Sequence, residues 1–189
     1  MLRNELKIAI RFTLLTTLLL GILYPLAVTA IGHFAFRQKA DGGLILSNGQ
    51  VIGSRLIGQS FAGGQYFHGR PSAAGNGYDP TSSSPSNLAA SNQKLISRID
   101  GDVAHYAAEN GSQPVPIDLV TASGSGLDPD ISPAAAMFQA ARVADARHLP
   151  LATVRALVER HVQRRQFGFL GEERVNVLLL NLDLDELGR

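Results

Sequence analysis

Residues 12–36, FTLLTTLLLGILYPLAVTAIGHFAF, run for 25 residues without a formally charged side chain. At 1.5 Å per residue, a helix of this length spans roughly 37 Å, more than the ~30 Å hydrocarbon core of a bilayer. Gly21 and Pro25 lie in its middle and indicate a kink or a packed helix face, because a neighbouring helix can satisfy the backbone groups that they disturb. The stretch predicts a helix that crosses a membrane with some tilt.

Two other interpretations of this stretch compete with a membrane helix. A cleaved signal peptide would have a basic leading region, which Arg3, Lys7 and Arg11 supply, and Val28 with Ala30 could form a cleavage site. The apolar run is nevertheless longer than the ~7–15 residues of a signal sequence, and it continues past the cleavage site. A buried core helix would normally have a polar face. A membrane anchor is therefore favoured over both.

The charges beside the span indicate its orientation. Arg3, Lys7 and Arg11 precede the apolar stretch, whereas Arg37 and Lys39 follow it. Basic residues concentrate on the cytoplasmic side of membrane spans. The small excess before the span favours a cytoplasmic N-terminus and a C-terminal part outside the cytoplasm.

Composition excludes several classes of function. The 189 residues include 17 Lys and Arg, 16 Asp and Glu and no cysteine, for a formal net charge of +1. No basic excess supports nucleic-acid binding. Without cysteine, the chain can form neither a disulfide nor a thiolate metal site, and thiol catalysis is also excluded.

The segment after the anchor begins with a predicted hairpin. Within residues 41–67, two apolar runs flank Asn48-Gly49, a dipeptide that favours a tight turn because both positions tolerate positive φ. Gly53 marks a candidate bulge in the second run.

Three helices are predicted from apolar residues spaced three and four apart. The first covers about Asn92 to Asn110 and closes at Gly111. The second opens at Ser132-Pro133, an N-cap followed by a proline at the first helical position, and runs to about Arg147. The third starts at Pro150, and its apolar face contains Leu151, Val154, Leu157, Val158 and Val162.

Two strands complete the predicted domain. One is short, from Ile117 to Thr121, and the other is the near-continuous apolar run RVNVLLLNLDLDEL at residues 174–187, typical of a strand covered on both faces. The expected fold class is therefore α/β, with a single N-terminal transmembrane helix followed by one small α/β soluble domain. The expected boundaries are a short cytoplasmic segment at 1–11, the transmembrane helix at 12–36 and the soluble domain at 37–189, with a long polar loop at 68–92.

This polar loop contains almost nothing that a hydrophobic core could use. After Phe67, the only sizeable apolar side chains of residues 67–92 are Tyr78 and Leu88. A loop this long is usually either functional or disordered, and composition alone leaves both interpretations open. Arg70 follows two aromatic residues and offers a planar guanidinium for a carboxylate, a phosphate or backbone carbonyls.

The sequence contains none of the catalytic or metal-binding motifs that would identify an enzyme. No phosphate-binding loop, dinucleotide fingerprint or serine-hydrolase elbow is present, and the five histidines contain no i, i+4 pair. Asp128 and Asp130 have the first spacing of a calcium loop, but Pro133 stands where that loop requires glycine. These carboxylates are better interpreted as acidic residues ahead of a helix N-terminus, where the helix dipole favours them.

Several blocks of the sequence, in order, resemble the C subunit of the Kdp potassium-transporting P-type ATPase. They are GSRLIGQSF, YFHGRPSA, YDP, SNLAASN, VPIDLVTASGSGLDPDISPAAA, RVADARHLP and the ending RVNVLLLNLDLD. The resemblance implies a single-pass protein of the cell inner membrane, with its C-terminal domain periplasmic. It also implies a non-catalytic accessory subunit of a high-affinity, ATP-driven potassium uptake pump. The expected partners are a channel-like potassium-translocating subunit, a P-type ATPase subunit, a small membrane peptide and the lipid bilayer, with no nucleic acid.

The resemblance implies two roles beyond assembly of the complex. One is to cap the ion entrance of the channel-like subunit from outside. The other is to act as a catalytic chaperone that raises the ATP affinity of the ATPase subunit. A direct contact with ATP conflicts with the first role, because ATP is cytoplasmic. ATP is thus implied only by the family, and no tightly bound cofactor is expected.

The chain departs from the family pattern at residues 83–89. Relatives can read SGGSNLA, similar to the signature loop of ABC-type ATPases, whereas this chain reads SSPSNLA. Glycines let backbone N–H groups approach a phosphate, and Pro85 has no N–H. The candidates carried over for nucleotide contact are Gln59, Ser86, Asn87 and Leu88. The loop or docking candidates are Arg70, Pro71 and Asp128.

One alternative comes from a different class of function. A membrane-tethered extracytoplasmic hydrolase or solute-binding module would use His68, Arg70 and Asp79. Such a site requires a nucleophile, a base and an orienting carboxylate that lie together in a pocket.

Overall fold

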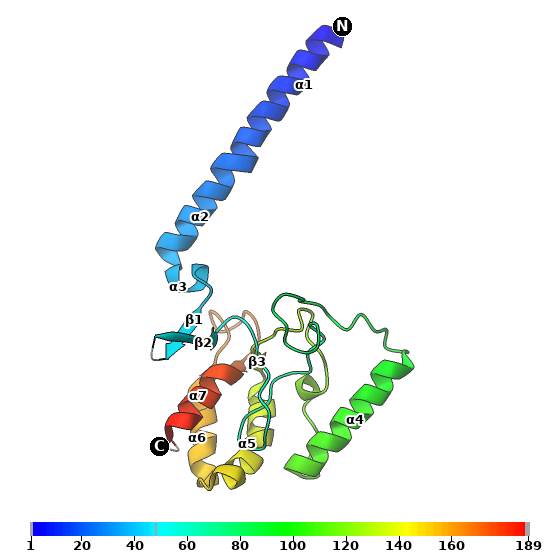
Figure 1. The fold of residues 1–189 in the computed structure, drawn as a ribbon, viewed down its shortest axis with the longest axis vertical. Helices are drawn as coiled ribbons and strands as arrows, with labels where there is room; N and C mark the ends of the chain where they lie inside the picture. Colours follow the sequence, from blue (N-terminus) through cyan, green and yellow to red (C-terminus); the bar gives the residue numbers. More distant parts are fainter. Residues whose placement is uncertain (1, 48, 188–189) are drawn as a thin grey trace. The chain divides into compact units, whose positions relative to one another are not determined.

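The computed structural model describes residues 2–47 and 49–187. It divides the chain into two compact units, one ending at Leu44 and the other beginning at Ile45. Figure 1 shows both units with the elements labelled. The helical elements of the first unit, in chain order, are α1 (Leu2–Thr16), the π-helical segment η1 (Thr17–Leu23), α2 (Tyr24–Ala35) and α3 (Arg37–Ala40).

A single apolar helix forms most of the first unit. It runs from Leu2 to Ala35, 34 residues in all, and is long and apolar enough to cross a membrane. This confirms the predicted spanning helix. The helix begins ahead of the apolar stretch at residue 12, because Leu2, Leu6 and Ile10 recur four apart on one face and continue the helical pattern. At 1.5 Å per residue its length is roughly 51 Å.

The π-helical segment η1 lies where Gly21 and Pro25 predicted a disturbance. The Tyr24 N–H donates to the Leu19 carbonyl, five residues back rather than four. Pro25 has no N–H, so the Gly21 carbonyl loses its ordinary helical partner. The helix absorbs this loss by widening one turn, a known outcome at such positions.

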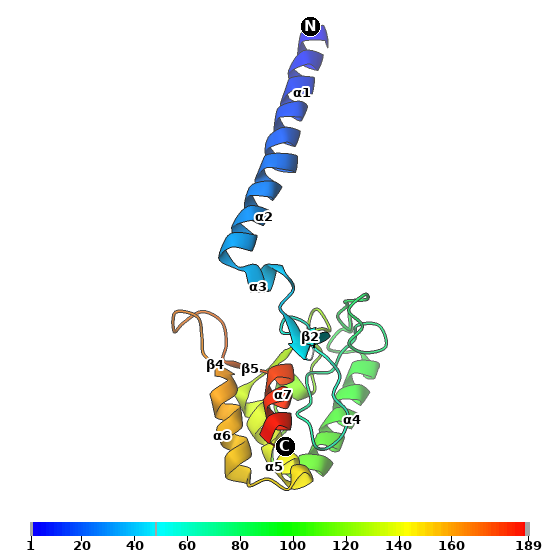
Figure 2. The same cartoon turned by 60° about the vertical axis from the view of Figure 1, so that its left-hand side comes forward.

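The second unit contains short strands between longer helices, as Figure 2 shows from another side. Its elements, together with β1, which spans the unit boundary, are β1 (Leu44–Ser47), β2 (Gln50–Ser54), α4 (Gln93–Asn110), the 3₁₀ turn η2 (Ile117–Leu119), β3 (Asp130–Ile131), α5 (Pro133–Arg147), α6 (Leu151–His161), β4 (Val162–Gln163), β5 (Arg174–Asn176) and α7 (Val177–Leu187).

Two small sheets organise these strands. β1 pairs with β2, and a three-stranded sheet has the order β3-β5-β4. In that sheet β5 is central and antiparallel to both neighbours, with Asp130 opposite Asn176 and Val162 opposite Val175. Mixed helices and strands confirm the predicted α/β domain.

The core lies where α5, α6 and α7 pack together beside β5. Its fully buried side chains come from the apolar faces of these helices, from β5, from η2 and from Phe67, the residue before the polar loop. The largest apolar members are Phe67, Leu119, Val143, Val154, Leu157, Val158, Val175, Leu180 and Leu184.

The predicted helix ends are confirmed at three places. The Asn92 side chain accepts from the Lys94 N–H at the start of α4, and Gly111 closes that helix with a φ of 94°. The Ser132 hydroxyl accepts from the Ala135 N–H at 3.0 Å and caps α5. Each cap satisfies backbone groups that a helix end leaves free.

The predicted strand at Ile117–Thr121 is wrong. Residues Ile117–Leu119 form the 3₁₀ turn η2, in which the Leu119 N–H donates to the Pro116 carbonyl. Thr121 reinforces the turn, because its hydroxyl donates to the Ile117 carbonyl at 2.8 Å. A run of five residues after a proline was too short for periodicity to separate a strand from a turn.

The predicted strand at residues 174–187 is wrong for most of its length. Only Arg174–Asn176 are extended, and Val177–Leu187 form α7. Val177, Leu180 and Leu184 are buried, a spacing of three and four. The near-continuous apolar run concealed this helical period. Asn176 was the available signal, because its Oδ1 accepts from the Leu179 N–H at 3.1 Å as an N-cap does.

The predicted hairpin turn is described in part. Asn48 lies outside the described residues, and Gly49 has a φ of 79°, as such a turn requires. Gly53 marks a close approach of side chains to β2. A Cβ at that position would lie 2.5 Å from Gln59 Nε2 and 2.7 Å from a methyl carbon of Leu178.

Candidate functional site

The polar loop at 68–92 begins beside two buried amide side chains. Phe67 donates its N–H to Asn181 Oδ1 and accepts from Asn181 Nδ2, both at 2.9 Å. In the same way, the His68 N–H donates to Gln139 Oε1 at 2.8 Å, and Gln139 Nε2 donates to the His68 carbonyl at 3.1 Å. Both amides are at least 99% buried. They therefore hold this backbone much as a neighbouring strand would.

Arg70 connects the loop to the segment before α5. Its Nη1 lies 2.9 Å from Asp128 Oδ2, and its Nε donates to the Thr121 carbonyl at 3.3 Å. The predicted acceptors, a carboxylate and a backbone carbonyl, are thus supplied by the chain itself. Pro71 follows directly, so Arg70, Pro71 and Asp128 lie in one region of the second unit.

Ser72 joins three backbone segments through one hydroxyl. It donates to the Gly126 carbonyl at 2.6 Å and accepts from the N–H groups of Tyr78 at 2.7 Å and Ala74 at 3.2 Å. A tight loop over residues 72–78 is closed by these bonds and attached to the second Gly/Ser-rich segment. Serine commonly forms such local bonds to the backbone.

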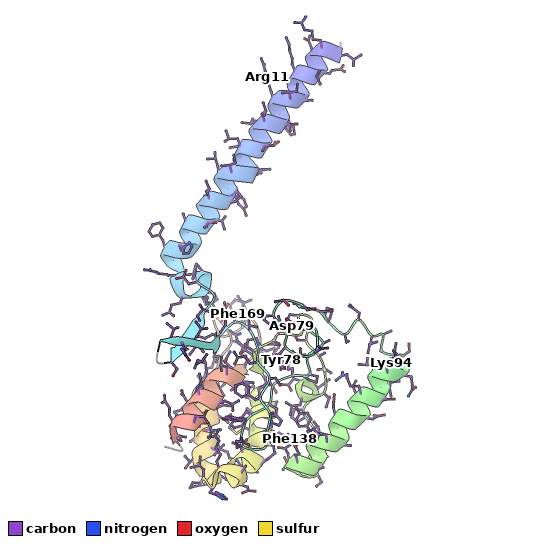
Figure 3. The ribbon with its side chains drawn as sticks, viewed as in Figure 1. Arg11, Tyr78, Asp79, Lys94, Phe138 and Phe169 are labelled. Carbon is purple, nitrogen blue, oxygen red and sulfur yellow. The ribbon has the colours of Figure 1, made fainter. Side chains whose placement is uncertain are left out.

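The Tyr78 side chain, labelled in Figure 3, packs against the start of this loop. Its hydroxyl donates to the Arg70 carbonyl at 2.6 Å. Burial raises the pKa of the phenol to about 12. Gly69 and Gly58 make room for it. A Cβ at Gly69 would lie 2.5 Å from the hydroxyl oxygen, and one at Gly58 would lie 2.8 Å from the ring.

The two Gly/Ser-rich segments pack on each other farther along. The Ser84 N–H and the Ser83 hydroxyl both donate to the Ser125 carbonyl, at 3.0 and 2.9 Å. Gly126 has a φ of 69°, and a Cβ there would lie 2.6 Å from the Ser84 carbonyl oxygen. The polar stretch is therefore an ordered loop cross-linked to residues 121–128. Sequence reasoning missed this pairing, because no local pattern connects segments about forty residues apart.

The nucleotide candidates carried over from the family lie in two places. Gln59 is beside β2, where its amide nitrogen donates to the Ile52 carbonyl at 3.2 Å. Ser86, Asn87 and Leu88 follow Pro85, and Asn87 has a φ of 52°. Within residues 2–47 and 49–187, no hydrogen bond or ion pair joins Gln59 to Ser86, Asn87 or Leu88.

A polar pocket of about 320 Å³ opens where the start of the loop faces α4. Its polar lining includes His68, Arg70, Tyr78, Asp102, His105 and Tyr106. Burial lowers the pKa of the His68 imidazole, and the hydrogen bond to the Gly63 carbonyl opposes this effect only in part. Burial therefore favours the neutral ring.

The groups proposed for a hydrolase are engaged separately. His68 Nε2 lies 3.0 Å from the Gly63 carbonyl oxygen. Asp79 is not among the residues that line the polar pocket, and its Oδ1 accepts from both the hydroxyl and the N–H of Thr81. These bonds lower the pKa of the Asp79 carboxyl. Asp79 therefore does not orient His68 as a general base.

A second pocket, of about 370 Å³, is lined mainly by acidic side chains and two arginines. Two of these carboxylates are paired with its arginines, since Asp128 contacts Arg70 and Asp130 lies 2.9 Å from Arg174. Burial raises the pKa of Asp130, although Asn176 and Arg174 oppose the rise. Asp118 holds the N-cap residue of α5, because its Oδ2 accepts from the Ser132 N–H at 2.6 Å.

Comparison with known proteins gives matches along nearly the whole chain. The family model described as K+-transporting ATPase, c chain, matches residues 6–186. A potassium-transporting ATPase KdpC subunit of Acidobacterium capsulatum is 55% identical over 184 residues, 97% of this chain and 99% of that protein. The KdpC subunit of Caulobacter vibrioides is 56% identical over 172 residues, 90% of this chain and 87% of the relative. The KdpC subunit of Mycobacterium tuberculosis is 50% identical over 188 residues, 98% of this chain and 100% of the relative. The similarity extends over both units.

Proposed function

Because the chain belongs to the KdpC family, the c chain of K+-transporting ATPases, we propose that it is a non-catalytic accessory subunit of a high-affinity, ATP-driven potassium uptake pump. It assembles with a channel-like potassium-translocating subunit, a P-type ATPase subunit and a small membrane peptide. Its soluble domain stabilises the complex and caps the ion entrance of the channel-like subunit.

The observation that carries this proposal is the internal bonding of the polar loop. Arg70, Ser72 and Tyr78 direct their polar groups to the chain's own carbonyls and to Asp128. A catalytic centre keeps a nucleophile and a base free for substrate. A loop whose polar groups are already bonded instead presents a fixed surface, which suits docking on a partner.

We propose that the membrane helix spans the bilayer over residues 12–36 with the N-terminus, residues 1–11, in the cytoplasm. The basic residues before the span support this orientation. The π-helical segment η1 and Pro25 supply the face that packs against the channel-like subunit. A widened turn weakens the regular backbone bonding, and in lipid a neighbouring helix favours such a site.

The proposal assigns the effect on ATP to contact between subunits rather than to a nucleotide site on this chain. Pro85 offers no N–H to a phosphate, and the Gln59 amide is bonded to β2. ATP titration of the purified chain, followed by the chemical shifts of Ser86, Asn87 and Leu88, tests this. Saturable shifts at these residues would contradict the assignment.

Deletion of the gene tests the pump role directly. Cells without this chain should fail to grow at limiting potassium and should recover at high potassium, and the chain should co-purify with the other pump subunits. Among point variants, Arg70→Ala should lower the yield of assembled pump, whereas Arg70→Lys should lower it less. Normal growth of the deletion strain at limiting potassium would contradict the proposal.

The orientation has its own test, because the chain has no native cysteine. A cysteine at the exposed residue Ser82 should react with a membrane-impermeant reagent in intact cells. A cysteine at Asn4, in the segment before the span, should react only after lysis. The opposite pattern would place the soluble domain in the cytoplasm.

A further inference from the structure

Residues 165–171, RQFGFLG, form an exposed apolar loop between β4 and β5, here called the aromatic loop. Phe167 is 86% exposed, Phe169 70% and Leu170 48%. Figure 3 labels Phe169 at the edge of the second unit. From Phe167 to Gly171 no side chain can form a hydrogen bond. Contiguous exposed apolar side chains of this size mark a site of contact.

The backbone of the aromatic loop is bonded to itself. Gln166 donates to the Leu170 carbonyl and accepts from the Leu170 N–H, both at 2.9 Å. The N–H groups of Gly168 and Phe169 donate to the carbonyls of Arg165 and Gln166 at 3.2 Å. The ion pair of Arg165 with Glu172, at 2.8 Å, closes the base. Four backbone N–H groups of the loop, those of Gln166, Gly168, Phe169 and Leu170, therefore keep a partner when the tip leaves water, which lowers the cost of entering an apolar surrounding.

The loop also holds its apolar side chains outward against a local strain. Phe167 has a φ of 53°, a conformation that residues other than glycine rarely adopt, and Gly168 and Gly171 follow with positive φ. A soluble loop without a partner would gain from turning the phenylalanine rings inward. An observed outlier of this kind is a reason to look for a functional contact.

The loop lies at the end of the second unit where the chain enters it. Figures 1 and 2 both place the segment between β4 and β5 at the end of this unit where β2 lies, with α5, α6 and α7 extending away from it. The chain enters the unit at the same end, through Ile45. Residues 36–43 follow the membrane helix and, at up to ~3.6 Å per residue, reach about 29 Å at most. The tether keeps a lipid surface within reach of this end.

We propose that the aromatic loop inserts into the interfacial region of the bilayer that holds the chain's own membrane helix. Phe167, Phe169 and Leu170 then lie at the boundary between headgroups and acyl chains, where aromatic side chains are favoured. A site for one protein partner would need polar groups to fix the register, and this tip has none. The inference rests on the membrane anchor and not on the proposed role in the pump.

The charges beside the loop sharpen the proposal. Arg164 and Arg165 precede the tip, and Glu172 and Glu173 follow it, so these four formal charges cancel, and Arg174 is paired with Asp130. Insertion is therefore driven by apolar burial rather than by attraction to anionic lipid. Binding of the loop should be the same on zwitterionic and anionic bilayers and should change little with salt.

The absence of tryptophan from the chain allows a direct measurement. Phe169→Trp introduces a single fluorophore at the tip of the full chain, reconstituted in bilayers of phosphatidylcholine. Its emission should be shifted to the blue and quenched by lipids that carry a nitroxide near the headgroup, with weak quenching by aqueous acrylamide. Ile117→Trp is the matched control, because Ile117 is also exposed, at 75%, and lies outside the loop. It should show the opposite pattern.

A second variant separates insertion from mere proximity. Phe167→Ser with Leu170→Ser, added to Phe169→Trp, should abolish lipid quenching while circular dichroism stays unchanged. Lipid quenching that is absent from the full chain would overturn the proposal. Protection of the tryptophan only after the other pump subunits are added would also overturn it, and would assign the loop to a protein partner.

Discussion

Gly126 lies where the two Gly/Ser-rich segments touch, and it combines a φ of 69° with a contact that leaves no room for a side chain. Gly126→Ala should destabilise the second unit by roughly 1–3 kcal/mol, because both the backbone conformation and the approach to the Ser84 carbonyl are strained. Chemical denaturation followed by circular dichroism measures this. Gly124→Ala is the matched control two residues away. A Cβ there has nothing within 4 Å, so an equal loss in both variants would contradict the argument.

His68 makes the stability of the second unit depend on pH. Burial holds its pKa below the ordinary value of 6.5, so the folded state favours the neutral ring. The unfolded chain takes up the proton first as pH falls, so the stabilising contribution is present above about pH 6.5 and is lost as pH falls through the folded pKa. The free energy of unfolding should decline from pH 7 to pH 5.

His68→Gln should flatten this decline. Its backbone would still bind Gln139, so a general loss of the loop is not expected. Unfolding curves of both proteins at several pH values give the comparison. An unchanged slope in the variant would assign the pH dependence to other groups.

The elements of the second unit depend on side chains that bind backbone across long sequence distances. Asn176 ends β5, caps α7 and also donates to the Arg55 carbonyl at 3.1 Å. Asn181 and Gln139 lie inside α7 and α5 and serve the backbone of Phe67 and His68. These three amides connect the helices to loops that have few apolar side chains of their own. The helices thus position the polar loop.

Asn176→Ala should destabilise the second unit by about 1–3 kcal/mol, since it removes a helix cap and the partly buried hydrogen bond to the Arg55 carbonyl. Asn176→Asp keeps the accepting oxygen for the Leu179 N–H and should recover part of the loss. Denaturation of the three proteins tests this order. Equal stability of the alanine and wild-type proteins would show that α7 begins without the cap.

At the scale of the whole molecule, the two units differ in what stabilises them. The first consists mainly of an apolar helix, in which none of the described residues Leu2–Ala35 is buried, and a lipid surrounding is the natural solvent for it. The second has its own core, whose buried members all lie between Phe67 and Leu184. No member of this core comes from the first unit, so the second unit is expected to fold without it.

A fragment that begins at Ile45 should unfold at the same denaturant midpoint as the full chain, because no core residue is removed. A fragment that begins at Gly69 should not fold. It lacks Phe67, and removing a buried phenylalanine side chain typically costs about 3–5 kcal/mol of stability. The Asn181 amide also loses its backbone partner. Circular dichroism of both fragments checks this. A lower midpoint for the longer fragment would contradict the independence of the units.

The amino-acid sequence by itself determined the parts that depend on local patterns. The uncharged stretch at 12–36 predicted the membrane helix, and Ser132 with Pro133 and Gly111 fixed helix ends, because caps and periodicity are set by neighbouring residues. Local patterns failed at residues 177–187, where an apolar run concealed a helix. Only the tertiary structure decided that the polar loop is ordered. Its partners, Asn181, Gln139, Asp128 and Ser125, lie between about forty and 114 residues away, and hydrogen bonds between polar groups leave no periodic trace in a sequence.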